Sequence, residues 1–163
     1  MSIFDTVTYV EDATSIDPTF LRAHNIETLL IDADNTLLAP KESLSSPRLK
    51  KWVAYLKKEG FGLYLISNNT SRRIDAVCED LGVEGMSFAH KPLIYKIRGF
   101  LETRNIDPAR CAFLGDQLFT DMIAARRLKM FAIMVAPISE NDYFYTRWIR
   151  RFERFVLRQG GKK

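Results

Sequence analysis

Two carboxylates stand two positions apart at the end of an apolar run, and a hydroxyl follows closely. The run is Leu29–Ile31, the acids are Asp32 and Asp34, and the hydroxyl belongs to Thr36. Alternate residues of a β-strand share one face, so we expect the two acids to point into one small volume. Like charges that close are unfavourable unless a cation or a chemical task holds them. A simple turn, which Asp and Asn also favour, is therefore the weaker interpretation.

Polar groups also follow three further apolar runs. Each run is short and almost entirely apolar, which is typical of strands in a parallel sheet covered on both faces. Ligands of such sheets bind at the carboxyl ends of the strands, so we expect these groups to meet at one edge. They are Ser67 and Asn68 after residues 62–66, Lys91 after residues 86–89, and Asp116 after residues 111–114.

The expected cluster has the parts that phosphoryl transfer needs. Carboxylate oxygens without nearby His or Cys ligands suit Mg²⁺. One carboxylate can act as a nucleophile, and a second can move protons to the leaving oxygen and from water. A lysine and a hydroxyl can hold the oxygens of the transferring phosphoryl group.

Helical patterns separate the apolar runs and predict the elements that position these groups. We expect strands over residues 28–32, 62–66, 86–89, 111–114 and 131–135. Helices are expected over residues 19–24, 93–103 and 119–128. Two more are expected to end at a glycine: one begins near residue 47 and stops at Gly60, and the other follows residue 70 and stops at Gly82. The alternation predicts one α/β domain over residues 1–163, with a Rossmann-like parallel sheet of about five strands and helices on both faces.

The motifs resemble those of the haloacid dehalogenase superfamily. Residues 32–36 look like its DxDxT signature, and Ser67, Lys91 and Gly115-Asp116 with Asp121 look like its later motifs, in the same order. The resemblance implies a phosphatase with Asp32 as nucleophile and Asp34 as general acid and base. It further implies Mg²⁺ held by Asp32, the Asp34 carbonyl and Asp116, phosphate held by Ser67, Asn68 and Lys91, and supporting roles for Thr36 and Asp121.

The spacing of these motifs leaves no room for the cap domains that the superfamily inserts. Only 30 residues separate Thr36 from Ser67, and only 23 separate Ser67 from Lys91, so we expect a capless enzyme with an open site. Over nearly the whole chain, the sequence also looks like the YqeG family of small bacterial phosphatases. That family is similar to phosphatases acting on phosphatidylglycerophosphate, which implies that this lipid is the substrate and phosphatidylglycerol the product.

The positive charge of the chain is concentrated at its C-terminal end. Residues 139–163 contain seven Lys or Arg and three acids, a balance of +4 that equals the net charge of the whole chain. Residues 142–158 have helical spacing and predict a basic amphipathic helix with an aromatic face. Such a helix can bind an anionic membrane surface or pack its aromatic side on the domain, and both interpretations stay open.

Location and alternative functions follow from weaker signals. We expect a cytoplasmic protein, with peripheral contact to the inner face of the membrane, because the sequence shows no signal peptide, no transmembrane segment and no disulfide pattern. One alternative is a phosphatase acting on a soluble phosphate ester or phosphoprotein. The other is a nucleic-acid- or ribosome-associated binding module, since a fold does not determine a function. A pure binder has no need for the acidic cluster, so we do not expect nucleic acid as a partner.

Overall fold

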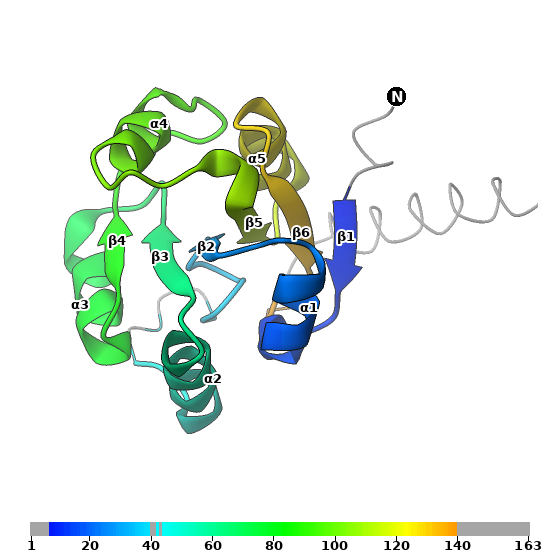
Figure 1. Cartoon of the computed structure of the whole chain (residues 1–163). Coiled ribbons are helices and arrows are strands. Elements are labelled where there is room, and N and C mark those ends of the chain that lie inside the picture. Colours follow the sequence, from blue (N-terminus) through cyan, green and yellow to red (C-terminus); the bar gives the residue numbers. More distant parts are fainter. Residues whose placement is uncertain (1–6, 40–41, 43, 140–163) are drawn as a thin grey trace, which may run out of the picture.

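The computed structural model describes residues 7–39, 42 and 44–139, and these form a sheet covered by helices (Figure 1). The sheet has six strands in the order β1-β6-β5-β2-β3-β4, and every neighbouring pair is parallel. The strands are β1 (Val7–Val10), β2 (Thr28–Ile31), β3 (Gly62–Ile66), β4 (Glu84–Met86), β5 (Cys111–Gly115) and β6 (Phe131–Val135).

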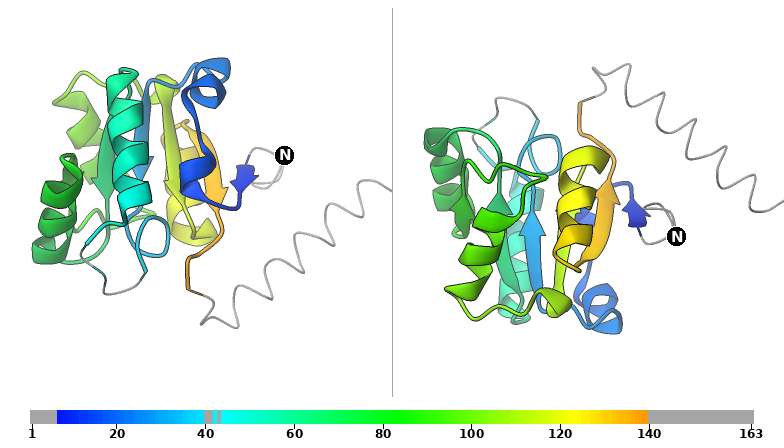
Figure 2. Two further views of the ribbon diagram at one scale, coloured as in Figure 1. Left: turned by 90° about the horizontal axis from the view of Figure 1, so that it is seen from below. Right: turned by 90° about the horizontal axis from the view of Figure 1, so that it is seen from above.

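Helices cover both faces of this sheet (Figure 2). Successive side chains of a strand point to opposite faces. Leu29 and Ile31 of β2 therefore join one apolar cluster, whereas Leu30 joins the other. The first cluster is covered by α1 (Pro18–Ala23), α2 (Pro47–Lys58) and α3 (Ser71–Leu81), and the second by α4 (Tyr95–Glu102) and α5 (Ile123–Arg127). The predicted α/β architecture is confirmed.

Helix ends lie where the capping residues predict them. The side chain of Asp17 accepts from the Phe20 backbone N–H at 2.7 Å, and Ser46 accepts from Leu49 at 3.2 Å. Each cap precedes a proline in the first helical turn, where its missing N–H costs nothing. At the other end, Gly82 closes α3 in the left-handed conformation with a φ of 64°.

The expected number of strands was too low by one. The missed strand, β1, is a four-residue edge strand that pairs only with β6. None of its residues is fully buried, so it lacks the continuous apolar run by which the other strands were predicted.

The third expected strand was misplaced. It was assigned to residues 86–89, but β4 ends at Met86. Phe88 and His90 then adopt positive φ angles of 50° and 61°, which an extended strand does not allow. The chain turns there and directs Lys91 back toward the sheet edge.

The expected helix over residues 119–128 has two parts. A π-helical turn over Leu118–Met122 leads into α5. Such wide turns are frequent at functional sites, and this one carries Asp121.

The described residues contain no inserted cap domain. A loop and α2 connect β2 to β3, and α3 connects β3 to β4. Among the same residues, no helix has the length and hydropathy needed to cross a bilayer. The expected basic helix over residues 142–158 lies outside the described residues.

Candidate active site

The loop after β2 carries the first two carboxylates. Asp32 directly follows the strand, and its backbone N–H donates to Leu114 O of β5 at 2.8 Å, so the sheet fixes its position. The chain then leaves the sheet, with Asn35 at a φ of 60°, a conformation that Asn adopts more easily than most residues. The Asn35 N–H donates to Leu38 O at 2.8 Å and closes the loop.

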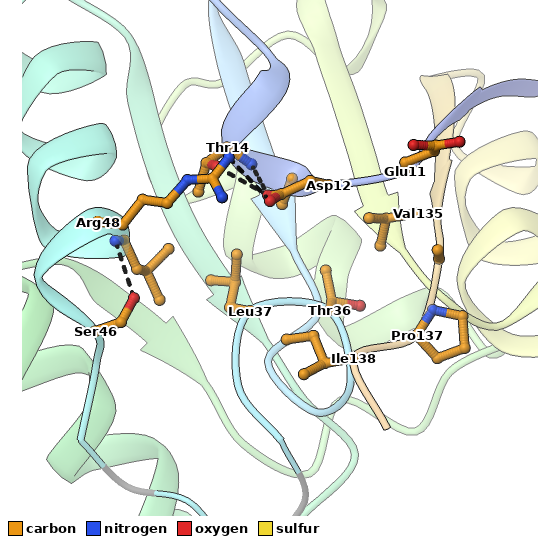
Figure 3. Close-up of a pocket in the computed structure, with 13 residues that line it drawn as sticks. Glu11, Asp12, Thr14, Thr36, Leu37, Ser46, Arg48, Val135, Pro137 and Ile138 are labelled. Carbon is orange, nitrogen blue, oxygen red and sulfur yellow. Dashed lines mark hydrogen bonds and ion pairs between the residues drawn. The ribbon is translucent and has the colours of Figure 1, made fainter. Parts of the chain in front are cut away.

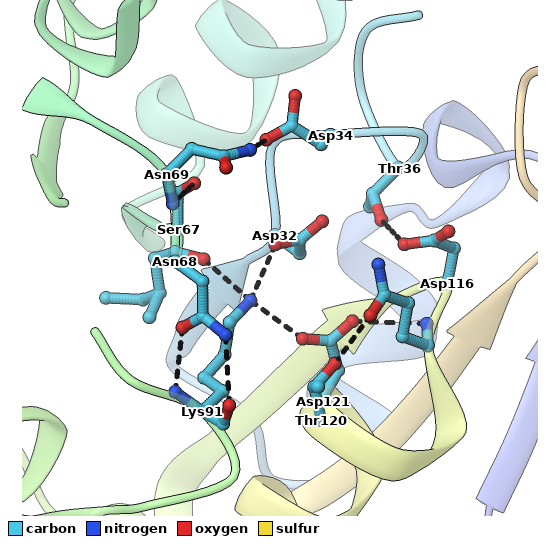
Figure 4. A network of polar contacts seen from close by, with 12 residues as sticks. Asp32, Asp34, Thr36, Ser67, Asn68, Asn69, Lys91, Asp116, Thr120 and Asp121 are labelled. Atoms are coloured by element: carbon cyan, nitrogen blue, oxygen red, sulfur yellow. Dashed lines mark hydrogen bonds and ion pairs between the residues drawn. The ribbon is translucent and has the colours of Figure 1, made fainter. Parts of the chain in front are cut away.

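Lys91 lies at the centre of the polar network shown in Figure 4. Its Nζ donates to Asp32 Oδ1 at 2.6 Å, to Asp121 Oδ1 at 2.7 Å and to Ile66 O at 3.0 Å. The Lys91 side chain is 2% exposed. An ammonium group has three N–H donors, so all three are used inside the protein and the ammonium group is held rigidly.

Asn68 holds the backbone of Lys91. Its Oδ1 accepts from Lys91 N at 2.7 Å and its Nδ2 donates to Lys91 O at 2.9 Å. Both ends of the carboxamide are therefore occupied, a contact that the sequence did not predict. The neighbouring Ser67 is fully buried, and its Oγ accepts from the Asn69 backbone N–H at 3.0 Å.

The loop after β5 supplies two more carboxylates. Asp116 Oδ1 accepts from Thr36 Oγ1 at 3.2 Å, which links this loop to the one after β2. Asp121 Oδ2 accepts from the Gln117 backbone N–H at 3.1 Å, while its Oδ1 faces Lys91. Gly115, the last residue of β5, has no room for a side chain, because a Cβ at that position would collide with the Asp121 carboxylate.

Three of these carboxylates lie close enough to share a cation. Oxygen atoms of Asp32, Asp116 and Asp121 lie within 4.8 Å of one another. Asp32 Oδ2 is buried and has no hydrogen-bond partner among the described residues. A buried polar atom without a partner is unfavourable, and hard oxygen donors suit Mg²⁺. The residues therefore fit a divalent cation at this position.

The charge of the cluster fits the same ion. When all groups are ionised, three carboxylates and one ammonium leave two negative charges uncompensated. Burial, followed by the charge of Asp121, raises the pKa of Asp32 well above its ordinary value and that of Asp116 to about 7. Burial alone would lower the pKa of Lys91, but Asp121 and Asp32 raise it. The cluster thus favours extra positive charge, as a proton or as a metal ion.

Asp34 does not face this cluster, and the expectation that it shares a strand face with Asp32 is wrong. β2 ends at Ile31, so the alternation of a strand no longer applies at position 34. The carboxylate instead forms an ion pair with Arg73. It also accepts a hydrogen bond from Asn69 Nδ2, which Figure 4 shows. Sequence reasoning missed Arg73, since nothing in the pattern links residues 39 positions apart.

Most exposed large hydrophobic side chains stand on the segments that follow the strand ends. Six of the eight exposed large hydrophobic side chains among the described residues stand on segments that follow the carboxyl ends of β2, β4, β5 and β6. These six, the apolar rim, are Leu44, Phe88, Leu93, Tyr95, Phe119 and Ile138. The carboxyl ends of parallel strands meet at one edge of the sheet, so these segments start from the same edge as the carboxylate cluster.

A separate cavity of about 270 Å³ lies beside the cluster (Figure 3). It is bounded by Thr14, Ser46, Arg48 and Ile138, and it shares Thr36 with the carboxylate cluster. Its volume is slightly below the range of roughly 300–1,000 Å³ that is usual for ligand pockets. We therefore place the candidate site at the carboxylate cluster and not in this cavity.

Comparisons with known proteins identify the family of the chain. A family model described as haloacid dehalogenase-like hydrolase matches residues 9–129. The chain is 31% identical over 149 residues to the Bacillus subtilis (strain 168) protein named Probable phosphatase YqeG, covering 91% of this chain and 87% of that one.

Solved structures with a similar fold include the following two. An uncharacterised protein from Listeria monocytogenes serotype 4b has a TM-score of 0.57 at 15% identity, over 71% of this chain and 84% of that one. The cobalt-bound deoxy-D-mannose-octulosonate 8-phosphate phosphatase of Haemophilus influenzae has a TM-score of 0.55 at 14% identity, over 71% and 72% of the two chains.

Proposed function

Because this chain belongs to the haloacid dehalogenase-like hydrolase family and is a phosphatase, we propose that it is a Mg²⁺-dependent phosphomonoesterase. Asp32 would form an aspartyl-phosphate intermediate. The observation that carries the proposal is the buried Asp32 Oδ2, which has no partner among the described residues and lies inside a cluster with two uncompensated charges. A bound Mg²⁺ would balance that charge and polarise a phosphate oxygen.

Each side chain of the site has a separate role in the proposed reaction. An Asp32 oxygen bonds to phosphorus as the ester oxygen leaves, and Asp34 gives that oxygen its proton. Asp34 then takes a proton from the water that hydrolyses the intermediate. Asp32, the Asp34 carbonyl and Asp116 would hold the metal, and Thr36 supports Asp116 through its hydrogen bond.

The phosphate is proposed to bind between the loops after β3 and β4. The Lys91 ammonium supplies positive charge near the phosphate, and the Ser67 hydroxyl supplies a hydrogen-bond donor to it. The Asn68 carboxamide keeps Lys91 in place, so Asn68 can offer its backbone to the phosphate. Asp121 supports Lys91 directly at 2.7 Å.

Asp32→Asn tests this proposal with almost no change of shape. We expect Mg²⁺-dependent phosphate release to disappear, together with the phosphoryl adduct that mass spectrometry detects on the Asp32 peptide of the wild type after an acid quench. Asp75→Asn, which changes an exposed carboxylate on α3, is the matched control and keeps both. Undiminished release by folded Asp32→Asn would show that another residue is the nucleophile.

For the substrate we propose a phospholipid monoester, phosphatidylglycerophosphate, which the protein would dephosphorylate to phosphatidylglycerol. Three features support it: an open site with no cap in the described residues, the apolar rim, and the basic aromatic sequence of residues 142–158. Peripheral contact of a cytoplasmic protein with an anionic membrane would bring the lipid phosphate to the site. A soluble phosphate ester or phosphoprotein is the alternative.

Mixed micelles distinguish these substrates. We expect the protein to hydrolyse phosphatidylglycerophosphate in micelles with a higher kcat/KM than soluble phosphate esters. Leu93→Ser and Phe119→Ser should reduce the micellar rate more than the soluble rate, whereas Tyr55→Ser, an exposed aromatic on α2, should reduce neither. Good turnover of soluble esters with none on micelles would reject the lipid and keep the phosphatase.

A further inference from the structure

Arg73 joins α3 to three residues of the loop after β2, which lies more than 30 positions earlier in the sequence. It stands in the first turn of α3, and its Nη1 donates to Asp34 Oδ1. Its Nε donates to Glu42 O at 2.8 Å and its Nη2 to Ala39 O at 3.4 Å. One guanidinium therefore fastens the loop after β2 to α3 and holds a carboxylate of that loop at the same time.

Both oxygens of Asp34 are held from this side of the site. Arg73 takes Oδ1 and Asn69 takes Oδ2, and the side chains of Arg73 and Asp34 are 20% and 18% exposed. Figure 4 shows Asp34 facing Asn69 and turned away from Asp116 and Asp121. The direction of the Asp34 carboxylate is thus set by α3 and the residue before its cap, and not by the buried cluster.

We propose that Arg73 is a positioning residue, which aims the Asp34 carboxylate at the oxygen of the leaving group. The inference rests on the proposed phosphatase function, in which the bond from phosphorus to the ester oxygen breaks as Asp34 transfers its proton to that oxygen. A proton donor must lie within hydrogen-bond reach of the atom it protonates. A short loop without other support would let Asp34 move, and Arg73 supplies that support.

An arginine suits this task better than a lysine. The planar guanidinium carries several donors in a fixed arrangement, so it can hold a carboxylate and two carbonyls together. A lysine offers a single nitrogen on a flexible stem. Arg72, the next residue, is exposed and has none of these contacts with Asp34, Ala39 or Glu42, which makes it the natural control.

The leaving group separates positioning of Asp34 from a general effect on the fold. The value of kcat/KM reports the steps up to departure of the leaving group. Nitrophenolate leaves without a proton, whereas an alkoxide needs one. For Arg73→Gln we therefore expect kcat/KM to fall by about tenfold or more on glycerol phosphate and by less than about threefold on p-nitrophenyl phosphate. Arg72→Gln should change neither.

Three further measurements test whether Arg73 acts through Asp34. Asn69→Ala, which removes the other donor to Asp34, should show the same selective loss if Arg73→Gln does not fold. Guanidinium chloride at low millimolar concentration should restore turnover of glycerol phosphate by Arg73→Ala. In an Asp34→Asn background, Arg73→Gln should cause no further loss.

These measurements distinguish a positioning role of Arg73 from a purely structural role and from direct phosphate binding. Equal losses on both esters, with no rescue by guanidinium, would mean that Arg73 only stabilises the loop. A rise in KM alone would make Arg73 a direct phosphate contact. Either result would overturn the positioning role and leave the phosphatase intact, whereas wild-type protein that hydrolyses neither ester would overturn the proposed function itself.

Discussion

Lys91 and Asp32 form a buried ion pair, in which Nζ lies 2.6 Å from Oδ1 and the two side chains are 2% and 8% exposed. A buried charge is tolerated only when it is paired and hydrogen-bonded. Here one lysine also faces Asp121, at 2.7 Å, so it cannot balance all the carboxylates around it. The pair is therefore incomplete without a further cation, and this imbalance makes the site sensitive to substitution, pH and metal.

Lys91→Met should be strongly destabilising. It leaves Asp32 and Asp121 buried without their shared partner, and breaking a buried pair costs about 3–5 kcal/mol. We expect urea unfolding to show a loss in this range and phosphate release to disappear. Lys50→Met, which removes the exposed pair with Asp80, should leave the unfolding midpoint almost unchanged. A stable, active Lys91→Met protein would contradict the central place of this lysine.

Metal binding should depend on pH through Asp116. Burial and the charge of Asp121 raise its pKa from 3.8 to about 7. A folded-state pKa above the unfolded value means that the group favours folding at low pH, and that this contribution is lost as pH rises through about 7. A bound cation replaces the lost proton, so Mg²⁺ should raise Tm more at pH 8 than at pH 5.5.

Asp116→Asn is the control for that prediction. The amide cannot ionise, so the gain in Tm from Mg²⁺ should become smaller, and its difference between pH 5.5 and pH 8 should shrink. Calorimetric titration of the metal-free protein with Mg²⁺ should also release protons near pH 6 in the wild type and fewer in this variant. Equal Mg²⁺ stabilisation of the wild type at both pH values would exclude Asp116 as the competing group.

The nature of the cation can be tested by exchange. EDTA should abolish turnover, and added Mg²⁺ should restore it. Ca²⁺ should restore it poorly, because it prefers more ligands at longer distances than a compact set of carboxylates provides. The readout is phosphate release from p-nitrophenyl phosphate, with Tm as a measure of binding that does not require activity. Full activity in EDTA would remove the metal from the mechanism.

The buried cluster was largely predictable because it depends on topology. Parallel strands bring their carboxyl ends to one edge, so residues that directly follow buried apolar runs must lie near one another. That reasoning placed Asp32, Lys91 and Asp116 together, and the observed distances agree. Asp121, which the family resemblance added, lies in the same cluster. The edge strand β1 could not be predicted in this way, because its four residues are partly exposed and form no buried apolar run.

The orientation of Asp34 could not be predicted in the same way. It depends on where β2 ends, on the left-handed Asn35, and on an arginine from α3. Local sequence patterns indicate the hydrophobic periodicity of an element and the residues that cap it. A contact between a loop and a helix depends instead on three-dimensional packing. The same holds for Asn68, whose amide binds the Lys91 backbone across a turn of positive φ angles.

Gly115 offers a test of how tightly the site is packed. A Cβ there would meet the Cγ and Oδ2 of Asp121 at less than contact distance, and Asp121 cannot move without leaving Lys91. Gly115→Ala should therefore destabilise the fold by about 1–3 kcal/mol and lower phosphate release. Gly99→Ala, on α4, meets nothing within 4 Å and should stabilise the helix by up to about 1 kcal/mol with unchanged turnover. Urea unfolding measures the stability of both variants, and phosphate release measures their activity. Unchanged stability and activity of Gly115→Ala would show that the Asp121 loop can shift to accommodate a Cβ.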